Sequence, residues 1–249
     1  MPVTLKSARE IELMRAAGRI AAIVLDELKS IARPGMTTAE LDKLACERVR
    51  ELGGRPAFLG YRGYPACLCT SVNEQVLHGI PGKRTLQDGD LLSLDIGVEY
   101  RGLYVDTAIS LVLGSGGALA YRLVAAAEGA FRAGLELAYP GRRLGDLGAA
   151  IEAYARAQGF NVIVGYSGHG VGLDLHEEPS VPNTGPAGRG IRLRPGMTLA
   201  VEPMLSAGSP ETVVAEDGWT VSTRDGSLTA HYEHTVWISP KGPVILTAR

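Results

Sequence analysis

The sequence predicts an α+β fold in which one unit, two helices followed by β-strands, occurs twice in a single domain. Apolar residues recur at three- to four-residue spacing in four long segments, and strand-like β-branched runs follow each helical pair. The second observation is that Pro34-Gly35 and the helical pattern behind it return at Pro140-Gly141. We expect one domain over residues 1–249 with an internal duplication of about 8–113 and 116–240, in which long helices back an antiparallel sheet.

The first copy begins with a helix that we expect over residues 8–30, with Ser7-x-x-Glu10 as its capping box. A second helix follows Pro34-Gly35, starts at the capping box Thr37-x-x-Glu40 and stops at Gly53. The periodic apolar residues that we expect to face the core are Ile11, Met14, Ile20, Val24, Leu28, Leu41, Ala45 and Val49.

The second copy repeats this order. A helix is expected over residues 118–138, and another follows Pro140-Gly141, has only Asp146 near its start as a cap, and stops at Gly159. Its apolar residues fall at the same offset as the Pro-Gly pair, namely Leu147, Ile151 and Ala155.

A tyrosine turn and a strand follow each helix pair. Gly60-Tyr61-Arg62-Gly63 corresponds to Gly165-Tyr166-Ser167-Gly168. Asp88-Gly89 then leads into LLSLD, and Pro195-Gly196 leads into TLAVE. This spacing superimposes Asp95 on Glu202, so a pseudo-twofold axis would bring the two carboxylates to equivalent, facing places.

Asp95 and Asp106 lie on two strands joined by Glu99-Tyr100-Arg101-Gly102, which predicts a hairpin. A turn centred between Tyr100 and Arg101 places the two aspartates directly opposite each other, and a turn centred one residue later makes them diagonal neighbours. In both cases their side chains share one face of the sheet.

Four acidic residues stand in apolar surroundings without Lys or Arg nearby: Asp95, Asp106, Glu202 and Glu233. One acidic residue in a strand is usually at an edge or faces solvent. Four such residues, two of them equivalent in the duplication, instead indicate a metal site, because a buried carboxylate must pair, protonate or bind a cation. The charges of four carboxylates and two divalent ions cancel, and a bridging hydroxide then leaves a net charge of −1. A set rich in oxygen suits Mn, Fe or Co, about 3.5–4 Å apart, rather than structural zinc.

The histidines leave two alternatives open. His169 and His176 are separated by an odd number of residues, so in an extended segment they would face opposite ways. Either a bend intervenes or only one of them binds metal. His78 precedes a Gly-Pro turn and alone would be a loop or core residue, and His234 next to Glu233 is expected to face away and be structural.

Composition narrows the class of protein. A formal net charge of −2 and a hydrophobic content of 45% give no sign of a nucleic-acid partner, and no apolar run is long enough to span a membrane. The N-terminal Lys6 and Arg9 replace the apolar run of a secretory signal. Three cysteines do not make a disulfide framework, and Cys67-x-Cys69 lacks a second pair for zinc. We therefore expect a cytoplasmic protein.

The ordered set of motifs resembles the methionine aminopeptidases over essentially the whole chain, in their type I bacterial form. Only a short segment separates His176 from Glu202, which leaves no room for the helical insertion of type II, and we expect no extension ahead of the first helix. The motifs are Asn73-Glu74, His78-Gly79-Ile80-Pro81, Leu94-Asp95-Ile96-Gly97, Asp106-Thr107, Gly168-His169-Gly170-Val171-Gly172, His176-Glu177-Glu178-Pro179, Val201-Glu202-Pro203-Met204 and Tyr232-Glu233-His234-Thr235.

The resemblance implies the pita-bread fold and a dinuclear centre of Co, Mn, Fe or Zn. It implies that Asp106 and Glu233 bridge the ions, that Asp95 chelates one, and that His169 and Glu202 hold the other. The bridging hydroxide would attack the first peptide bond and release the N-terminal methionine, with a preference for a small second residue.

The resemblance also assigns catalytic roles and a substrate pocket. Glu202 would shuttle the proton, His176 would stabilise the oxyanion, and His78 would contact the substrate backbone. The pocket for the methionine side chain would be lined by Phe58, Tyr61, Tyr64, Cys69, Leu175 and Trp219, of which Phe58 and Leu175 depart from the usual residues. Asn73 and Thr229 would help to hold a monovalent cation.

Other readings stay open from the sequence. A prolidase or X-Pro aminopeptidase has the same fold, and a catalytically inactive relative would bind peptides, RNA or a partner protein. A structural Mg²⁺ or Ca²⁺ site is a further alternative. The expected partner is the N-terminal Met of nascent polypeptides, with ribosome contact open, no membrane or specific nucleic acid, and a monomer as the default.

Overall fold

A computed structural model describes residues 3–248 of the chain. At its centre lies a curved, nine-stranded sheet with the order β1-β4-β5-β14-β9-β7-β8, in which β2 also pairs with β4 and β15 with β14. Its pairings are antiparallel, as predicted. The strands are β1 (Arg55–Pro56), β2 (Cys69–Val72), β4 (Leu91–Tyr100), β5 (Leu103–Val112), β7 (Gly168–Gly170), β8 (Glu177–Val181), β9 (Thr198–Val201), β14 (Glu233–Ser239) and β15 (Gly242–Ile245).

Two small sheets extend the structure beyond the main one. Their strand orders are β13-β10-β6 and β11-β12-β3. The strands are β3 (Gln75–Leu77), β6 (Asn161–Val162), β10 (Met204–Ser206), β11 (Thr212–Val214), β12 (Val221–Thr223) and β13 (Thr229–His231). No helix within residues 3–248 is both long and apolar enough to cross a membrane.

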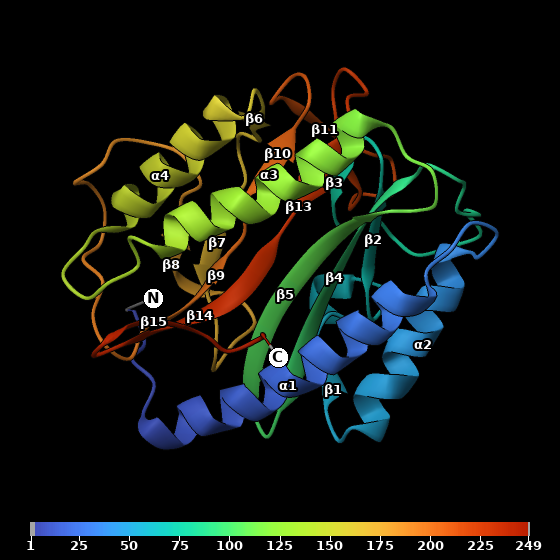
Figure 1. Cartoon of the computed structure of the whole chain (residues 1–249). Coiled ribbons are helices and arrows are strands. Elements are labelled where there is room, and N and C mark those ends of the chain that lie inside the picture. Colours follow the sequence, from blue (N-terminus) through green and yellow to red (C-terminus); the bar gives the residue numbers. More distant parts are fainter. Residues whose placement is uncertain (1–2, 249) are drawn as a thin grey trace.

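Four helices lie on one side of the curved sheet, in two pairs (Figure 1). The pairs are α1 (Ala8–Ile31) with α2 (Thr38–Glu51), and α3 (Ala118–Leu135) with α4 (Leu144–Ala157). The first pair packs on β4 and β5 in one hydrophobic cluster, and the second packs on β9 and β14 in another. The helices therefore leave the opposite side of the sheet open for a site.

The helix ends follow local chemistry. The capping boxes of Ser7 with Glu10 and of Thr37 with Glu40 both form, as predicted. Asp146 caps α4, because its carboxylate accepts a hydrogen bond from the backbone N–H of Arg143 at 2.8 Å. Helix α3 ends earlier than expected, at Leu135, since the backbone N–H groups of Leu137 and Ala138 donate to carbonyl oxygens three residues back, which makes a tighter turn.

The hairpin between β4 and β5 takes the second of the two predicted registers. Asp95 pairs with Ala108 and Asp106 pairs with Gly97, so the aspartates are diagonal neighbours. The turn is centred one residue later because Arg101 (φ 53°) and Gly102 (φ 84°) both adopt left-handed conformations, as a two-residue hairpin loop requires.

The cysteines correct one expectation. Cys46 on α2 and Cys67 before β2 form a disulfide with their Cα atoms 5.6 Å apart, whereas Cys69 is free and buried. The expectation drawn from the odd cysteine count is therefore wrong for this pair, because a count carries no information on which helix packs against which strand. The pairing also removes Cys67 from any Cys67-x-Cys69 zinc site.

Candidate metal centre and substrate pocket

The sheet directs the predicted carboxylates to the side opposite the helices. Leu94 and Ile96 of β4 belong to the cluster around α1, so Asp95 between them points the other way. Asp106 lies on β5, Glu233 begins β14, and Glu202 directly follows β9. Since β5, β14 and β9 are neighbours in the sheet, four segments far apart in sequence meet at one place.

Burial makes this group of carboxylates electrostatically costly. Burial and the nearby charges of Asp106 and Glu202 raise the pKa of Asp95 far above its usual range. Burial also raises the pKa of Asp106 to about 7, and it raises the pKa of Glu202 and Glu233 well above normal. Among the described residues, neither Lys nor Arg forms an ion pair with any of the four. A cation is the group that would resolve this repulsion.

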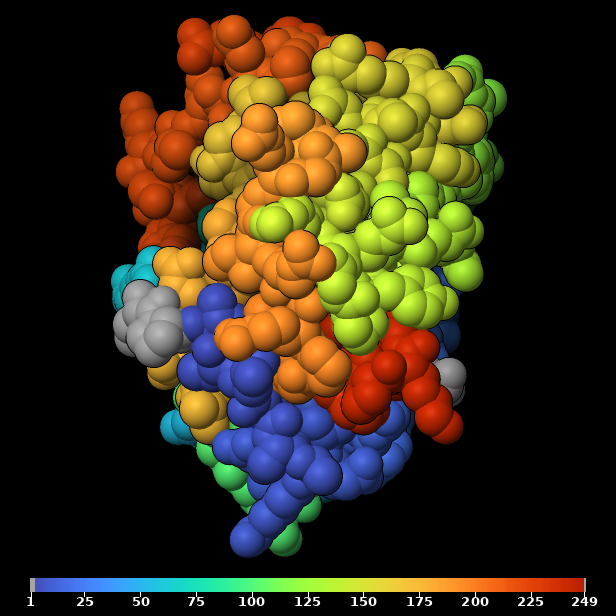
Figure 2. Space-filling model, turned by 90° about the vertical axis from the view of Figure 1, so that its left-hand side faces the viewer, coloured from blue at the N-terminus to red at the C-terminus, as the bar shows by residue number. Residues whose placement is uncertain are grey.

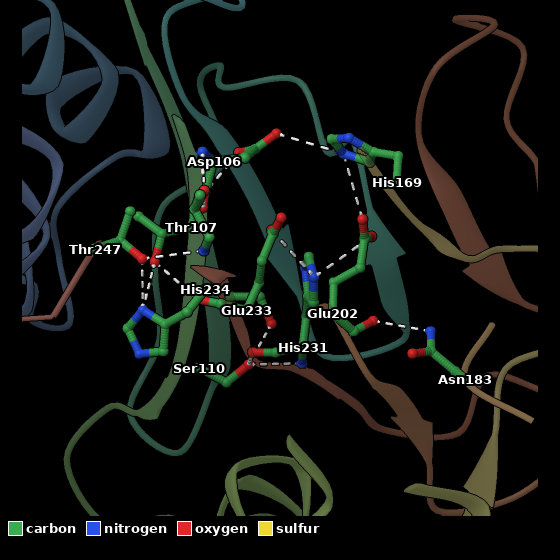
Figure 3. A network of polar contacts seen from close by, with 12 residues as sticks. Asp106, Thr107, Ser110, His169, Asn183, Glu202, His231, Glu233, His234 and Thr247 are labelled. Carbon is green, nitrogen blue, oxygen red and sulfur yellow. Dashed lines mark hydrogen bonds and ion pairs between the residues drawn. The ribbon is translucent and has the colours of Figure 1, made fainter. Parts of the chain in front are cut away.

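His169 joins the carboxylates from β7. Its Nε2 atom lies 3.5 Å from Oε1 of Glu202 and 3.8 Å from Oδ2 of Asp106, and its Nδ1 atom lies 2.9 Å from the carbonyl oxygen of Gly170 (Figure 3). Burial lowers the pKa of His169 to about 4. The imidazole is therefore neutral at neutral pH, which is the form that binds a metal ion.

A bend brings the second histidine of this segment to the same side. The chain turns between β7 and β8, and the rings of His169 and His176 approach to 4.0 Å between centroids. The ring of His176 also stacks on Tyr61 at 5.2 Å, with 15° between the ring planes. The bend was one of the two alternatives left open by the spacing, and it places His176 beside the centre.

The donor atoms fit divalent metal ions. Oδ1 of Asp95, Oε1 of Glu233 and Nε2 of His231 are buried without a hydrogen-bond partner among the described residues. Ligand atoms of Asp106, His169 and Glu233 lie within 4.8 Å of one another, and so do those of Asp95, His231 and Glu233. Carboxylate oxygens and imidazole nitrogens at this separation suit Mn, Fe, Co or Zn.

Two other histidines differ in their relation to the centre. His234 lies on the other side of its strand, as predicted, with Nδ1 2.8 Å from Oγ1 of Thr247 (Figure 3). His231 received no role from the sequence, yet it lies 3.6 Å from Glu233 through its Nε2 atom. Its position two residues before Glu233 was the available signal, since residues two apart in an extended segment point to the same side.

A cavity of about 380 Å³ leads to this centre. Every residue that we expected in the pocket lines it, together with the four carboxylates. These pocket residues are Phe58, Tyr61, Tyr64, Cys69, His78, Leu175, His176 and Trp219. The ring of Phe58 reaches the cavity because Gly97 has no side chain, and a Cβ atom at Gly97 would lie 2.6 Å from Cε1 of Phe58.

The residues expected at a monovalent cation lie close together but away from the lining of the cavity. Oγ1 of Thr229 lies 2.8 Å from the carbonyl oxygen of Gln75 and 3.1 Å from that of Asn73, so its single hydroxyl hydrogen is shared between them. The Asn73 side chain donates to Asp90 and accepts from the backbone N–H of Leu91. The cation itself stays a prediction.

The fold and this centre define a metallopeptidase. The pattern of Metallopeptidase family M24 matches residues 12–240, and the chain belongs to this family, among its methionine aminopeptidases. The chain is 47% identical to the methionine aminopeptidase of Clostridium perfringens, over 98% of each chain. The crystal structure of the methionine aminopeptidase from Thermotoga maritima superimposes with a TM-score of 0.98 at 43% identity, with full coverage of both chains. The resemblance and the expected fold are thereby confirmed.

A prolidase from Pyrococcus furiosus shares the fold alone. It is 22% identical with a TM-score of 0.79, and the match covers 98% of this chain but 65% of the prolidase.

Proposed function

We propose that this protein is a metal-dependent aminopeptidase that removes the N-terminal methionine from polypeptides. The observation that carries the proposal is the cavity that ends at four carboxylates and two neutral imidazoles. An apolar chamber beside a metal centre suits a substrate that places one side chain in the chamber and its first peptide bond over the ions. The relatives with 40–50% identity carry this activity in their names.

The proposed centre holds two divalent ions of the Co, Mn, Fe or Zn group. Asp106 and Glu233 would bridge them, Asp95 would bind one, and His169 and Glu202 the other. Such ions supply an activated water and polarise a carbonyl group. The placement of Glu233 supports this assignment, because its carboxylate belongs to both groups of donor atoms.

Three side chains would carry the proton transfers and charge stabilisation. The Glu202 carboxylate, whose pKa is raised by burial, would take the proton of the attacking water and pass it to the amide nitrogen. His176, held by its stacking on Tyr61, would donate a hydrogen bond to the developing oxyanion. His78, which also lines the cavity, would contact the substrate backbone.

The pocket supports methionine as the first residue. Phe58, Tyr64, Cys69 and Leu175 are buried and pack in one cluster with Tyr61 and Trp219. An unbranched thioether side chain makes favourable contacts with such aromatic and sulfur-containing surroundings. A preference for a small second residue is part of the proposal and follows the methionine aminopeptidases that the chain resembles.

The proposal extends to the compartment, the oligomeric state and the partners of the protein. The protein would act in the cytoplasm, as a monomer, on nascent chains and without a membrane or nucleic-acid partner. Contact with the ribosome would have to rest on scattered exposed basic residues, because the net charge is −2.

A peptide assay tests the proposal against its nearest competitor. Metal-loaded protein is offered Met-Ala-Ser and Ala-Pro peptides, before and after dialysis against a chelator. We expect release of methionine from Met-Ala-Ser only, its loss on chelation, and its recovery with Mn²⁺ or Co²⁺. The Asp106→Asn variant should lose both metal and activity. Cleavage of Ala-Pro alone would favour a prolidase, and binding of two ions without hydrolysis of either peptide would favour an inactive relative.

A further inference from the structure

The donor atoms at the centre fall into two groups of three that share one residue. One group contains Asp106, His169 and Glu233, and the other contains Asp95, His231 and Glu233. Each group has a carboxylate of its own, an imidazole of its own, and the shared Glu233. In the ligand set implied by the resemblance, His169 is the only imidazole, and the ion beside Asp95 has oxygen ligands alone.

The second group, which contains Asp95, His231 and Glu233, has buried side-chain atoms without hydrogen-bond partners in the described part of the chain. Three of the six buried side-chain atoms that lack a hydrogen-bond partner within residues 3–248 belong to it: Oδ1 of Asp95, Nε2 of His231 and Oε1 of Glu233. Buried polar atoms are rarely left unpaired, and three that converge on one space indicate an absent ligand common to them. Nε2 of His231 lies 3.6 Å from Oε2 of Glu233 and 4.0 Å from Oε2 of Glu202, too far for direct hydrogen bonds.

The backbone fixes His231 in this position. Residue His231 is 2% exposed, and its N–H group donates to Oγ of Ser110 at 2.9 Å, while the same hydroxyl group donates to its carbonyl oxygen at 2.8 Å. Ser110 lies on β5, which also carries Asp106 (Figure 3). The ring is thus held from the strand that supplies another ligand, and it enters the space between Glu202 and Glu233 as Figure 3 shows.

We propose that Nε2 of His231 is a further metal ligand, bound to the ion that Asp95 and Glu233 hold. The proposal rests on the dinuclear centre proposed above and completes it, since each ion then has one nitrogen donor. A neutral imidazole adds no charge, so the balance of four carboxylates against two divalent ions is unchanged. A nitrogen donor at each position also favours Mn, Fe, Co or Zn over Mg or Ca, which prefer oxygen ligands throughout.

Pulsed electron paramagnetic resonance on Mn²⁺-loaded protein tests the assignment, because it detects imidazole nitrogens bound to the ion. The measurement is made in the His169→Ala variant, because this substitution removes the one imidazole that is already expected to bind metal. We predict that its bound Mn²⁺ still shows imidazole nitrogen couplings and that His169→Ala/His231→Ala loses them. Persistence of the couplings in the double variant would assign them to another histidine and overturn the proposal, as would their absence in His169→Ala.

Calorimetric titration with Mn²⁺ gives a second measurement. His231→Gln replaces the imidazole with a side chain of similar size. We expect this variant to bind the ion held by Asp95 and Glu233 about 10- to 100-fold more weakly, the range seen when groups that support a metal ion are removed. The matched control is His234→Gln, three residues further along the chain on β14 but facing away from the centre, which should leave both affinities unchanged. Equal affinities for His231→Gln and the unaltered protein would overturn the proposal.

The two proposals fail in different ways. If the unaltered protein binds no metal or releases no methionine on metal loading, the proposed function is wrong. If it binds two ions and is active while the nitrogen couplings are independent of His231, only the present inference is wrong.

Discussion

The Lys6 ammonium group forms an ion pair with the Glu177 carboxylate, although 171 residues separate them. Both side chains are buried, at 1% and 6% exposure. The other carboxylate oxygen of Glu177 accepts hydrogen bonds from the backbone N–H groups of Leu173 (2.5 Å) and Asp174 (3.1 Å). The N-terminal segment, which lies against the later part of the chain in Figure 2, is thereby tied to the loop that carries His176.

Replacing Lys6 should therefore reduce both stability and turnover. Lys6→Met leaves a buried carboxylate unpaired, which costs about 3–5 kcal/mol, and it releases the loop that positions His176. We expect a lower midpoint in urea and a lower kcat for Met-Ala-Ser, with partial rescue of both by Lys6→Arg. The matched control is Lys43→Met, whose exposed partner Glu47 is 4.0 Å away, and which should change stability by less than about 1 kcal/mol. Equal effects of the two substitutions would contradict the role of the buried pair.

His176 and His78 should be needed for turnover but not for metal binding. His176→Ala removes the hydrogen-bond donor proposed for the oxyanion, and loss of one such donor lowers kcat by about 10²–10³-fold. His78→Ala should lower kcat by a smaller factor. Steady-state kinetics and metal analysis of the same samples check both expectations, and unchanged kcat with two ions bound would remove these residues from the chemistry.

Leu175 should determine which side chain the pocket accepts. It is buried in the cluster around Phe58 and Tyr64, so Leu175→Ala enlarges the chamber. We expect the ratio of kcat/KM for Met-Ala-Ser over Phe-Ala-Ser to fall by about 10-fold or more, because a missing methylene contact is worth about 1–3 kcal/mol. Leu173→Ala, on the same loop but exposed, is the control that should leave the ratio unchanged. A constant ratio in both variants would show that Leu175 does not shape the pocket.

Gly18 in the middle of α1 should be intolerant of alanine. Alanine normally stabilises a helix by about 1 kcal/mol relative to glycine. Here a Cβ atom would lie 1.9 Å from the carbonyl oxygen of Leu246, a backbone atom that cannot move aside alone. We expect Gly18→Ala to lower the melting temperature, whereas Ala16→Gly in the same helix should show only the propensity effect. An increase in melting temperature for Gly18→Ala would disprove the close approach.

Sequence reasoning succeeded where residue chemistry or local pattern decides the outcome. The capping boxes of α1 and α2 are local, and the carboxylates Asp95, Asp106, Glu202 and Glu233 converge as the absence of basic neighbours indicated. The metal-binding roles of these residues stay predictions, as does the internal duplication.

The remaining features depend on contacts that the sequence leaves open. The hairpin register depended on whether Arg101 or Tyr100 takes the left-handed turn position, and a shift of one residue changes every partner. The disulfide between Cys46 and Cys67 depends on how α2 packs beside β2. His231 was missed although Glu233 is two residues away, because Asp95, the third member of its group of donor atoms, lies on the distant strand β4.

Glu233 and Thr247 lie near the C-terminal end of the chain, and Thr247 binds His234 directly behind the centre. Because the four carboxylates come from segments as far apart in sequence as β4 and β14, the two halves of the chain must fold together before these side chains can meet.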